Sequence, residues 1–468
     1  MKKPITEALL SLTITILLSV LVFSTPHNNI AEQNITFSSD SLSAEYLESI
    51  FIATFGQEFL RNYAISSEVA QSIHESFPRR TDGNIDFPEH FGGMYLDSSG
   101  NLVILTTDIQ ATIDTTIDGQ IRIETENIRV VTFSYSELTG VINEITRLIN
   151  RYYPSNPSHT IHAIATNLIS LELDTIGNRI IVNLIDYSPN HINFFKAHII
   201  DHPSLHFAEH NRCVATIAQM MAERSNHASN NANDVLEENY IEVTPFAARV
   251  DLRPGDALRR GTATSNIISS VGFRATLGGI SGFITAGHGN TIGTYLYSAN
   301  GVRVGSVTAT GALPPDLNLD ELHHLDFAFV QFAPHTIINW IQSPRASTQT
   351  NLGNRTAFPL INSPVARISE GGTLFAPNAA TRFSTGNITS ATYRPFAGGI
   401  GLVDAARANY SSTSGESGAP VIRYPSSLDP VAILGINIGR SATVVGDTVF
   451  TITADIMNNH GGTRISPF

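Results

Sequence analysis

The chain of 468 residues contains a single cysteine, Cys213, so no disulfide bond can form within it. Its resistance to unfolding must therefore come from packing and from a high unfolding barrier. Charged residues are also scarce, at 15% of the sequence. No basic patch stands out, which argues against a nucleic-acid partner. The hydrophobic fraction of 42% excludes wholesale disorder, and the length predicts two or three domains.

Lysine is absent from residues 249–468, which contain 15 arginines and 12 acidic residues and so carry a net charge of +3. The residues before them carry −16, giving −13 for the whole chain. Opposite charges favour association of the two parts. A simple drift of composition along the chain explains the same numbers.

Long apolar runs are absent except near the N-terminus, where Lys2 and Lys3 precede a mostly apolar run from Ala8 to Phe23. This run of 16 residues is shorter than the roughly 20 that a membrane-spanning helix needs. The pattern is typical of an export signal over residues 1–24, cleaved after Ser24. We therefore expect a secreted protein, with an uncleaved membrane anchor as the alternative.

Residues 25–245 predict an α+β region. The pattern Leu-Asp-x-x-Gly-Asn occurs twice, each time between short apolar runs, and predicts two related β-hairpins at 93–105 and 171–184. Apolar spacing predicts helices at 44–51, 65–77 and 204–225, and a further helix from Ser136 to Arg151 that is capped by Ser136. The polar, acidic stretch 226–242 is interpreted as a linker.

Residues 246–468 have a different texture, in which short apolar segments alternate with glycine, asparagine and serine. Strands are predicted at 271–276, 282–285, 302–309 and 327–332. This pattern is typical of an all-β barrel or sandwich domain.

Three motifs in this domain carry chemistry. A strand ends in Thr-Ala-Gly before His288, which leaves room for an imidazole, and Asp326 opens an otherwise apolar strand. Ser417 lies between glycines in Thr-Ser-Gly-Glu-Ser-Gly-Ala-Pro. Each motif alone is weak evidence. Together they supply a nucleophile, a base and a carboxylate that orients the base, as acyl transfer requires. One barrel is expected to hold His288 and Asp326 and a second to hold Ser417.

The serine motif also predicts a site for a negatively charged oxygen. Gly418 lets the chain bend sharply after Ser417. The backbone N–H groups of Gly415 and Ser417 are then expected to converge on one point, as stabilisation of an oxyanion requires.

These motifs resemble the chymotrypsin-like serine proteases, and in particular the bacterial branch of streptogrisins and α-lytic protease. The resemblance covers about Val250 to the C-terminus, and the two hairpin units resemble the pro-regions of that branch. It implies a chymotrypsin-like fold of two six-stranded β-barrels, preceded by an α+β pro-region that acts as an intramolecular inhibitor and folding aid.

The activity implied is that of a serine endopeptidase acting on protein or peptide substrates without a cofactor. We expect self-processing between about Tyr240 and Arg249 and a monomer after processing. Two departures from the family pattern are Gly289, where a cysteine is usual, and Glu416, where an aspartate is usual. The longer acid requires a shifted cationic partner.

Substrate contacts are expected at two places. The strand that contains Ile436, Asn437, Ile438 and Gly439 resembles the one that pairs with the substrate backbone. Ser411 stands six residues before the nucleophile, where trypsin-type enzymes have an aspartate. Its neutral side chain favours apolar or small substrate side chains over Arg or Lys.

Two other interpretations remain open. His206, Glu209 and His210 match the His-x-x-Glu-His pattern of inverted zinc peptidases, and on a helix the two histidines would share one face. Alternatively, the chain is a binding protein, either a catalytically idle protease fold or a surface-anchored protein that uses its acidic N-terminal half.

Overall fold

The computed structural model of the chain describes the following residues. They are 44–80, 85–111, 127–152, 159–209, 252–288, 290–311, 325–333, 360–369, 383–397, 400–401, 405–413, 415–424, 433–440, 447–452, 456 and 465–467. The expected export signal, the linker with its processing region, Cys213 and Gly289 lie outside the described residues.

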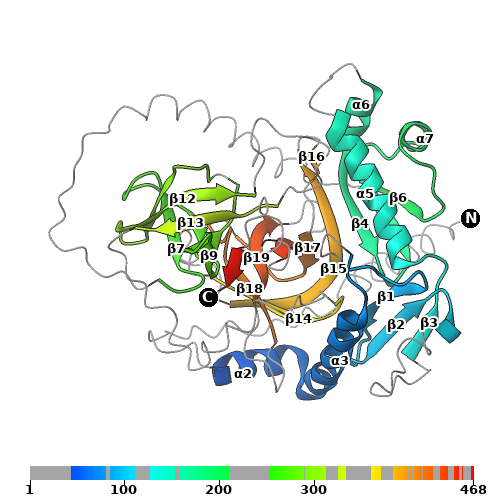
Figure 1. Cartoon of the computed structure of the whole chain (residues 1–468), viewed down its shortest axis with the longest axis horizontal. Helices are drawn as coiled ribbons and strands as arrows, with labels where there is room; N and C mark the ends of the chain where they lie inside the picture. The colour runs from blue at the N-terminus through cyan, green and yellow to red at the C-terminus, as the bar shows by residue number, and fades with distance from the viewer. Residues whose placement is uncertain are drawn as a thin grey trace, which may run out of the picture. The chain divides into compact units, whose positions relative to one another are not determined.

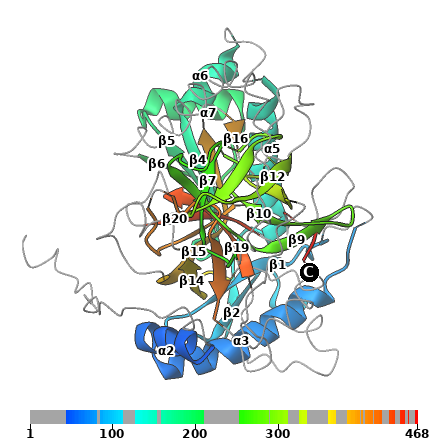
Figure 2. The same ribbon diagram turned by 90° about the vertical axis from the view of Figure 1, so that its left-hand side faces the viewer.

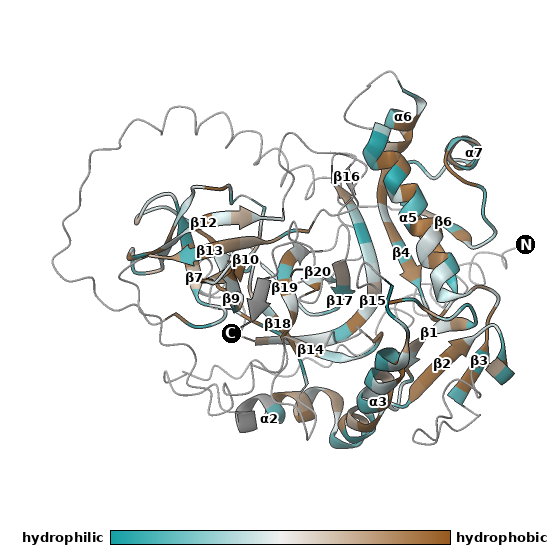
Figure 3. Cartoon of the chain, viewed as in Figure 1, coloured by the Kyte–Doolittle hydropathy of each residue, from teal (hydrophilic) through white to brown (hydrophobic). Residues whose placement is uncertain are grey.

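Helices and one small sheet form the first portion of the chain, here called the N-terminal part (the described residues 44–209). Its first elements are α2 Ala44–Phe55, α3 Gln57–Ser76, β1 Phe91–Leu96, β2 Leu102–Thr106 and β3 Ile128–Val130. The first predicted hairpin is β1–β2, whose strands are buried throughout and strongly apolar (Figure 3). Helix α3 packs along β1 and β2 (Figure 2).

The remaining elements of the N-terminal part are α5 Tyr135–Tyr152, α6 Thr160–Asn167, β4 Leu168–Asp174, β5 Arg179–Leu184, α7 Pro189–His198 and β6 Leu205–Glu209. Helix α5 spans the predicted helix, and β4–β5 is the second predicted hairpin. In its turn Asn178 adopts a φ of 48°, and its side chain binds the backbone of Phe133 just before α5.

The helix expected at 204–225 is wrong in its first residues, because β6 is a strand that pairs in parallel with β5. Buried Phe207 lies between exposed His206 and half-buried Ala208, which fits the alternation of a strand. Pairing with a neighbouring strand decides the local structure here, and local apolar spacing could not reveal that partner.

The first barrel is built from β7 Ala257–Arg260, β8 Ile267–Ser270, β9 Arg274–Leu277, β10 Ile280–Thr285, β11 Tyr295–Ser298, β12 Arg303–Thr310 and β13 Ala328–Phe332. Its strand order is β9-β10-β13-β12-β11-β7-β8, and β21 Ile465–Pro467 adds to β9. Strands β8 and β9 are two halves of one interrupted strand, because Gly272 and Phe273 between them exchange backbone hydrogen bonds with Ile284. The ring of six is therefore closed.

The second barrel is built from β14 Pro364–Ile368, β15 Phe383–Ala397, β17 Ala405–Ala408, β18 Pro420–Arg423, β19 Ile433–Arg440 and β20 Thr448–Ile452, with β16 Ile400–Gly401 paired to the end of β15. The order β14-β18-β19-β20-β17-β15 closes because β15 also pairs with β14. Both rings follow the same cyclic order along the chain. The predicted fold class, a chymotrypsin-like pair of six-stranded barrels after an α+β region, is confirmed (Figure 1).

Each barrel encloses its own apolar core. Phe283, Leu296 and Val330 are among the residues that fill the first barrel, and Val365 and Phe450 among those that fill the second. These side chains are completely buried. The barrels thus form rigid scaffolds for the loops that leave their strands.

The N-terminal part continues the sheet of the second barrel. Strand β4 pairs antiparallel with the far end of β15, where Glu172 lies opposite Tyr393, so that β4, β5 and β6 extend one ten-stranded sheet (Figure 1). Tyr63 of α3 packs against Tyr424, and Asn362 donates a hydrogen bond from Nδ2 to the carbonyl of Leu96. Strand pairing, aromatic packing and hydrogen bonds therefore all link the two parts.

Candidate active site

His288 follows directly after β10, in the segment Thr-Ala-Gly-His. A side chain at Gly287 would place its Cβ 2.6 Å from the carbonyl oxygen of Phe327 and 3.0 Å from Oδ1 of Asp326. Only a glycine therefore lets the end of β10 approach the start of β13 this closely. The small residues before His288 bring its ring next to Asp326.

Asp326 is almost completely buried, and both of its carboxylate oxygens contact His288. Oδ1 accepts a hydrogen bond of 2.6 Å from the backbone N–H of His288, and Oδ2 lies 2.6 Å from Nδ1 of the imidazole. A carboxylate in this position favours the tautomer that carries its proton on Nδ1. Nε2 is then free to accept a proton.

Ser417 lies on the other side of the imidazole, in the loop between β17 and β18 of the second barrel. Its Oγ is 2.9 Å from Nε2 of His288 and 3.0 Å from the carbonyl oxygen of Ile438. The structure therefore brings the three predicted side chains together in one chain of hydrogen bonds. As expected, the first barrel provides His288 and Asp326, and the second provides Ser417.

The loop around Ser417 has a backbone that only glycine adopts readily. Gly415 has a φ of 87° and Gly418 a φ of 88°. A side chain at Gly418 would collide with Oγ1 of Thr285 and lie 2.6 Å from the carbonyl oxygen of Ser270. Both glycines on which the oxyanion prediction depends are therefore required by conformation, and Gly418 is required by space as well.

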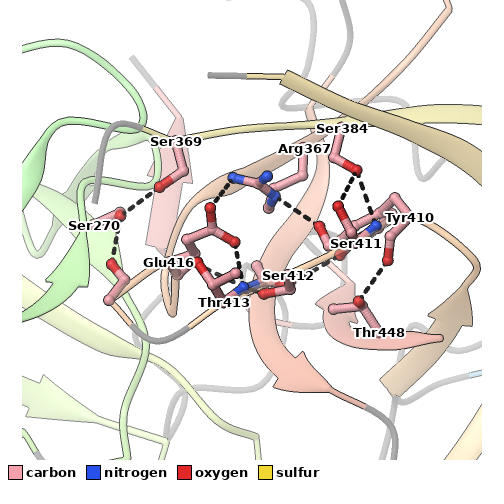
Figure 4. A network of polar contacts seen from close by, with 12 residues as sticks. Ser270, Arg367, Ser369, Ser384, Tyr410, Ser411, Ser412, Thr413, Glu416 and Thr448 are labelled. Atoms are coloured by element: carbon pink, nitrogen blue, oxygen red, sulfur yellow. Dashed lines mark hydrogen bonds and ion pairs between the residues drawn. The ribbon is translucent and has the colours of Figure 1, made fainter. Parts of the chain in front are cut away.

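The cationic partner of Glu416 is Arg367, which lies in β14 (Figure 4). The carboxylate Oε1 lies 2.7 Å from Nη1 of Arg367, and both side chains are at most 3% exposed. Burial lowers the pKa of the Arg367 guanidinium, and the charge of Glu416 opposes that shift. Glu416 Oε2 also accepts a 2.6 Å hydrogen bond from the N–H of Thr413. The pair fixes the side chain that precedes the nucleophile.

The longer acid at position 416 predicted a shifted cationic partner, but its identity was not apparent from the sequence. The signal was present, since Arg367 interrupts an otherwise apolar strand, Pro-Val-Ala-Arg-Ile. Arg367 also donates from Nε to the carbonyl of Ser411 at 3.2 Å, which ties β14 to the segment before the nucleophile (Figure 4). A buried arginine needs such partners.

The residues expected to contact substrate are placed in different ways. The side chains of Ile436 and Asn437 are fully buried, so any contact of these residues with substrate is left to the backbone. The amide of Asn437 donates to Oγ of Ser412 at 2.9 Å and to the carbonyl of Glu416 at 3.0 Å, and its oxygen accepts from the hydroxyl of Tyr410. Neighbouring residues of a strand point to opposite faces, and both faces of this central strand are covered here.

Of the other expected contacts, Ile438 is buried, whereas Gly439 and Ser411 are at least partly accessible. Ile438 presents its backbone carbonyl to Ser417, and Gly439 is half-buried. Ser411 is exposed and exchanges hydrogen bonds with Ser384, through its N–H and its hydroxyl (Figure 4). Pairing of a substrate backbone with this strand, and selection by Ser411, stay predictions.

The zinc interpretation loses its premise. His206 and Glu209 lie on strand β6, three residues apart, so their side chains point to opposite faces of the strand. Both are exposed, and His210 lies outside the described residues. Within the described part of the chain, no group of three His, Cys, Asp or Glu side chains could hold a metal ion.

A family model described as the Pro-like C-terminal domain matches residues 136–210, from α5 to just after β6. No curated protein matches the chain. Solved structures similar to the chain include Cellulomonas bogoriensis chymotrypsin (20% identity, 47% of this chain and 99% of that chain, TM-score 0.31) and Thermobifida fusca Protease A (20%, 47% and 100%, 0.31). Nocardiopsis protease is a third (22%, 46% and 100%, 0.30).

The Pro-like match lies in the N-terminal part and the double barrel in the C-terminal part. The Pro-like match agrees with the two hairpin motifs of the sequence, and the double barrel agrees with the motifs around His288, Asp326 and Ser417. The resemblance to bacterial chymotrypsin-like proteases that carry an N-terminal pro-region is confirmed.

Proposed function

We propose that the chain is the precursor of a secreted serine endopeptidase, with Ser417, His288 and Asp326 as its catalytic triad. The observation that carries the proposal is the unbroken hydrogen-bonded chain from the buried Asp326 carboxylate through His288 to the hydroxyl of Ser417. A half-buried serine hydroxyl held 2.9 Å from Nε2 of an imidazole is poised for nucleophilic attack.

The reaction is an acyl transfer in two stages. Oγ of Ser417 attacks the peptide carbonyl carbon while Nε2 of His288 takes its proton. The carbon–nitrogen bond then breaks, and His288 returns the proton to the leaving amine. In the second stage, water attacks the carbonyl carbon of the acyl-enzyme while Nε2 of His288 takes its proton. The bond to Oγ of Ser417 then breaks, His288 returns the proton to Ser417, and the acid is released. Asp326 holds the imidazole and stabilises its positive charge during each stage.

The N–H groups of Gly415 and Ser417 are proposed to stabilise the oxyanion of the tetrahedral intermediate. The positive φ of Gly415, together with the ion pair between Glu416 and Arg367, supports a fixed loop at this point. In other acyl-transfer sites, loss of one such donor lowers kcat by about 10²–10³.

The precursor is proposed to consist of a signal peptide over residues 1–24, a pro-region over 25–245 and a protease domain over 246–468. The pro-region assists the folding of the protease domain and inhibits its activity until the protease cuts its own chain between about Tyr240 and Arg249. The released protease domain then acts as a monomer on protein or peptide substrates. The strand pairing of β4 with β15 supports a tight association of the two parts. None of the described helices is long and apolar enough to cross a membrane.

The test compares wild type with Ser417→Ala, both expressed with export. A fluorophosphonate should label wild type and not the variant, and gel mobility with N-terminal sequencing should show a new N-terminus within 240–249 in wild type alone. Ser265→Ala, in the turn between β7 and β8 where its hydroxyl bonds Thr262, is the matched control and should behave as wild type. A wild type that is neither labelled nor cut would refute the proposal and favour a binding protein.

A further inference from the structure

Ser270, the last residue of β8 in the first barrel, lies against the loop of Ser417 in the second. It is completely buried, and all three of its polar groups are engaged. Its N–H donates to the carbonyl of Ser417 at 2.7 Å, and its hydroxyl donates to the carbonyl of Gly415 at 2.9 Å. Its own carbonyl accepts from Oγ1 of Thr285 at 2.8 Å. One residue thus holds the carbonyls on both sides of Glu416.

A second serine extends this contact. Oγ of Ser369, just after β14, lies 3.0 Å from Oγ of Ser270 and is equally buried (Figure 4). A hydroxyl has only one proton to donate, and that of Ser270 goes to Gly415. Ser369 must therefore be the donor to Ser270. The two hydroxyls form a directed chain that strengthens the hydrogen bond to Gly415.

The anchored carbonyl restrains the residue whose N–H group is expected to face the oxyanion. A glycine rotates freely about φ and ψ, so nothing in its own structure keeps the φ of 87°. This carbonyl belongs to the peptide that joins Gly415 to Glu416, and rotation about ψ of Gly415 would break its buried hydrogen bond and leave both groups unsatisfied. The hydroxyl of Ser270 therefore restrains one of the two rotations by which the N–H of Gly415 could turn away.

We propose that Ser270 is a positioning residue, whose hydroxyl restrains the backbone of Gly415 so that its N–H faces the oxyanion. This inference rests on the proposed function. The residue does not touch the reacting atoms. Its effect is expected on transition-state stabilisation and not on the binding of the ground-state substrate.

The matched control is the adjacent residue. Ser269 is also buried, at 2% exposure, yet within the described part of the chain its hydroxyl has no hydrogen-bond partner. Ser269→Ala and Ser270→Ala each remove one buried hydroxyl from the same strand, and only the second releases Gly415. Any general effect of shortening a side chain in β8 appears in both.

The experiment measures peptide hydrolysis and inhibition by a peptide boronate, whose tetrahedral adduct with Ser417 places an oxygen at the oxyanion position. For Ser270→Ala we expect kcat to fall about 10- to 100-fold, with KM within about twofold of wild type. Boronate affinity should weaken by the same factor as kcat. Ser269→Ala should match wild type in all three quantities.

Ser369→Ala provides a second variant if Ser270→Ala does not fold. It leaves the bond between Ser270 and Gly415 in place but removes the donor behind it, so a smaller fall in kcat and boronate affinity is expected. Where the wild type is active, the decisive comparison is between Ser269→Ala and whichever of these two variants folds. If both have the same kcat and boronate affinity, the inference is overturned and the proposed function stands. An inert wild type would instead refute the proposed function.

Discussion

One guanidinium joins the N-terminal part to the second barrel. Nη2 of Arg407, on β17, lies 2.6 Å from Oε1 of Glu172 on β4, and its Nε lies 3.1 Å from Oδ2 of Asp447. Glu172 is only 5% exposed. A buried carboxylate that shares its cation with a second acid should be costly to ionise. The stability of the intact chain should therefore depend on pH through Glu172.

The direction and size of this dependence follow from the pKa. Burial raises the pKa of Glu172 from 4.5 to about 7, with Asp174 and Asp447 adding to the rise and Arg407 and a hydrogen bond from Ser390 opposing it. Between these two pH values the folded chain keeps a proton that the unfolded chain has lost. The contribution is therefore fully present below pH 4.5 and is lost as pH rises through about 7. It amounts to about 3 kcal/mol.

Glu172→Gln removes this titration and imitates the neutral acid. We expect the variant to match its parent at pH 4.5 and to be more stable by up to about 3 kcal/mol at pH 8.5. Urea unfolding over this range measures the effect, in a Ser417→Ala background that keeps the chain uncut. Glu68→Gln, on the exposed face of α3, is the control. Equal pH slopes for Glu172→Gln and its parent would refute the reasoning.

Two further predictions concern the loop and the triad. Arg367→Met should lower the free energy of unfolding by about 3–5 kcal/mol in urea, because Glu416 is left buried without its cation, and adding Glu416→Leu should restore much of the loss. Full additivity of the two substitutions would argue against this pairing. Asp326→Asn should keep the fold, as judged by circular dichroism, and lower kcat for peptide hydrolysis about 10⁴-fold, because an amide favours the wrong imidazole tautomer. An unchanged kcat would exclude Asp326 from the triad.

The arrangement of His288, Asp326 and Ser417 was predictable because each lies in a motif that a short stretch of sequence displays. Small residues before the histidine, an acid at the start of an apolar strand and glycines around the serine are local features. The spacing of short apolar segments likewise predicted barrel strands, since alternation and turn residues act over a few positions.

The errors and omissions share a different physical origin. Strand β6, the cation Arg367 and the burial of Ile436 and Asn437 all depend on partners that are distant in sequence. The sequence of a short segment of mixed apolar and polar residues does not show whether that segment will pair with another strand. Only the closed barrel determines which faces of β19 are covered.

The pairing of β4 with β15 is the most distant of these contacts and explains why the two parts of the chain depend on each other. Strand β15 has 15 residues, and its last residues are paired with β4 and β16 beyond its contacts with β17. There Arg394 is buried, with its guanidinium donating to Oγ1 of Thr146 at 3.0 Å and to Oδ1 of Asn143 at 2.5 Å. Separation of the N-terminal part would expose a strand edge. It would also leave Arg394 without these two partners and Arg407 without Glu172. Because the chain has no disulfide to hold the second barrel closed, such contacts are a direct means for the N-terminal part to stabilise the barrel that carries Ser417.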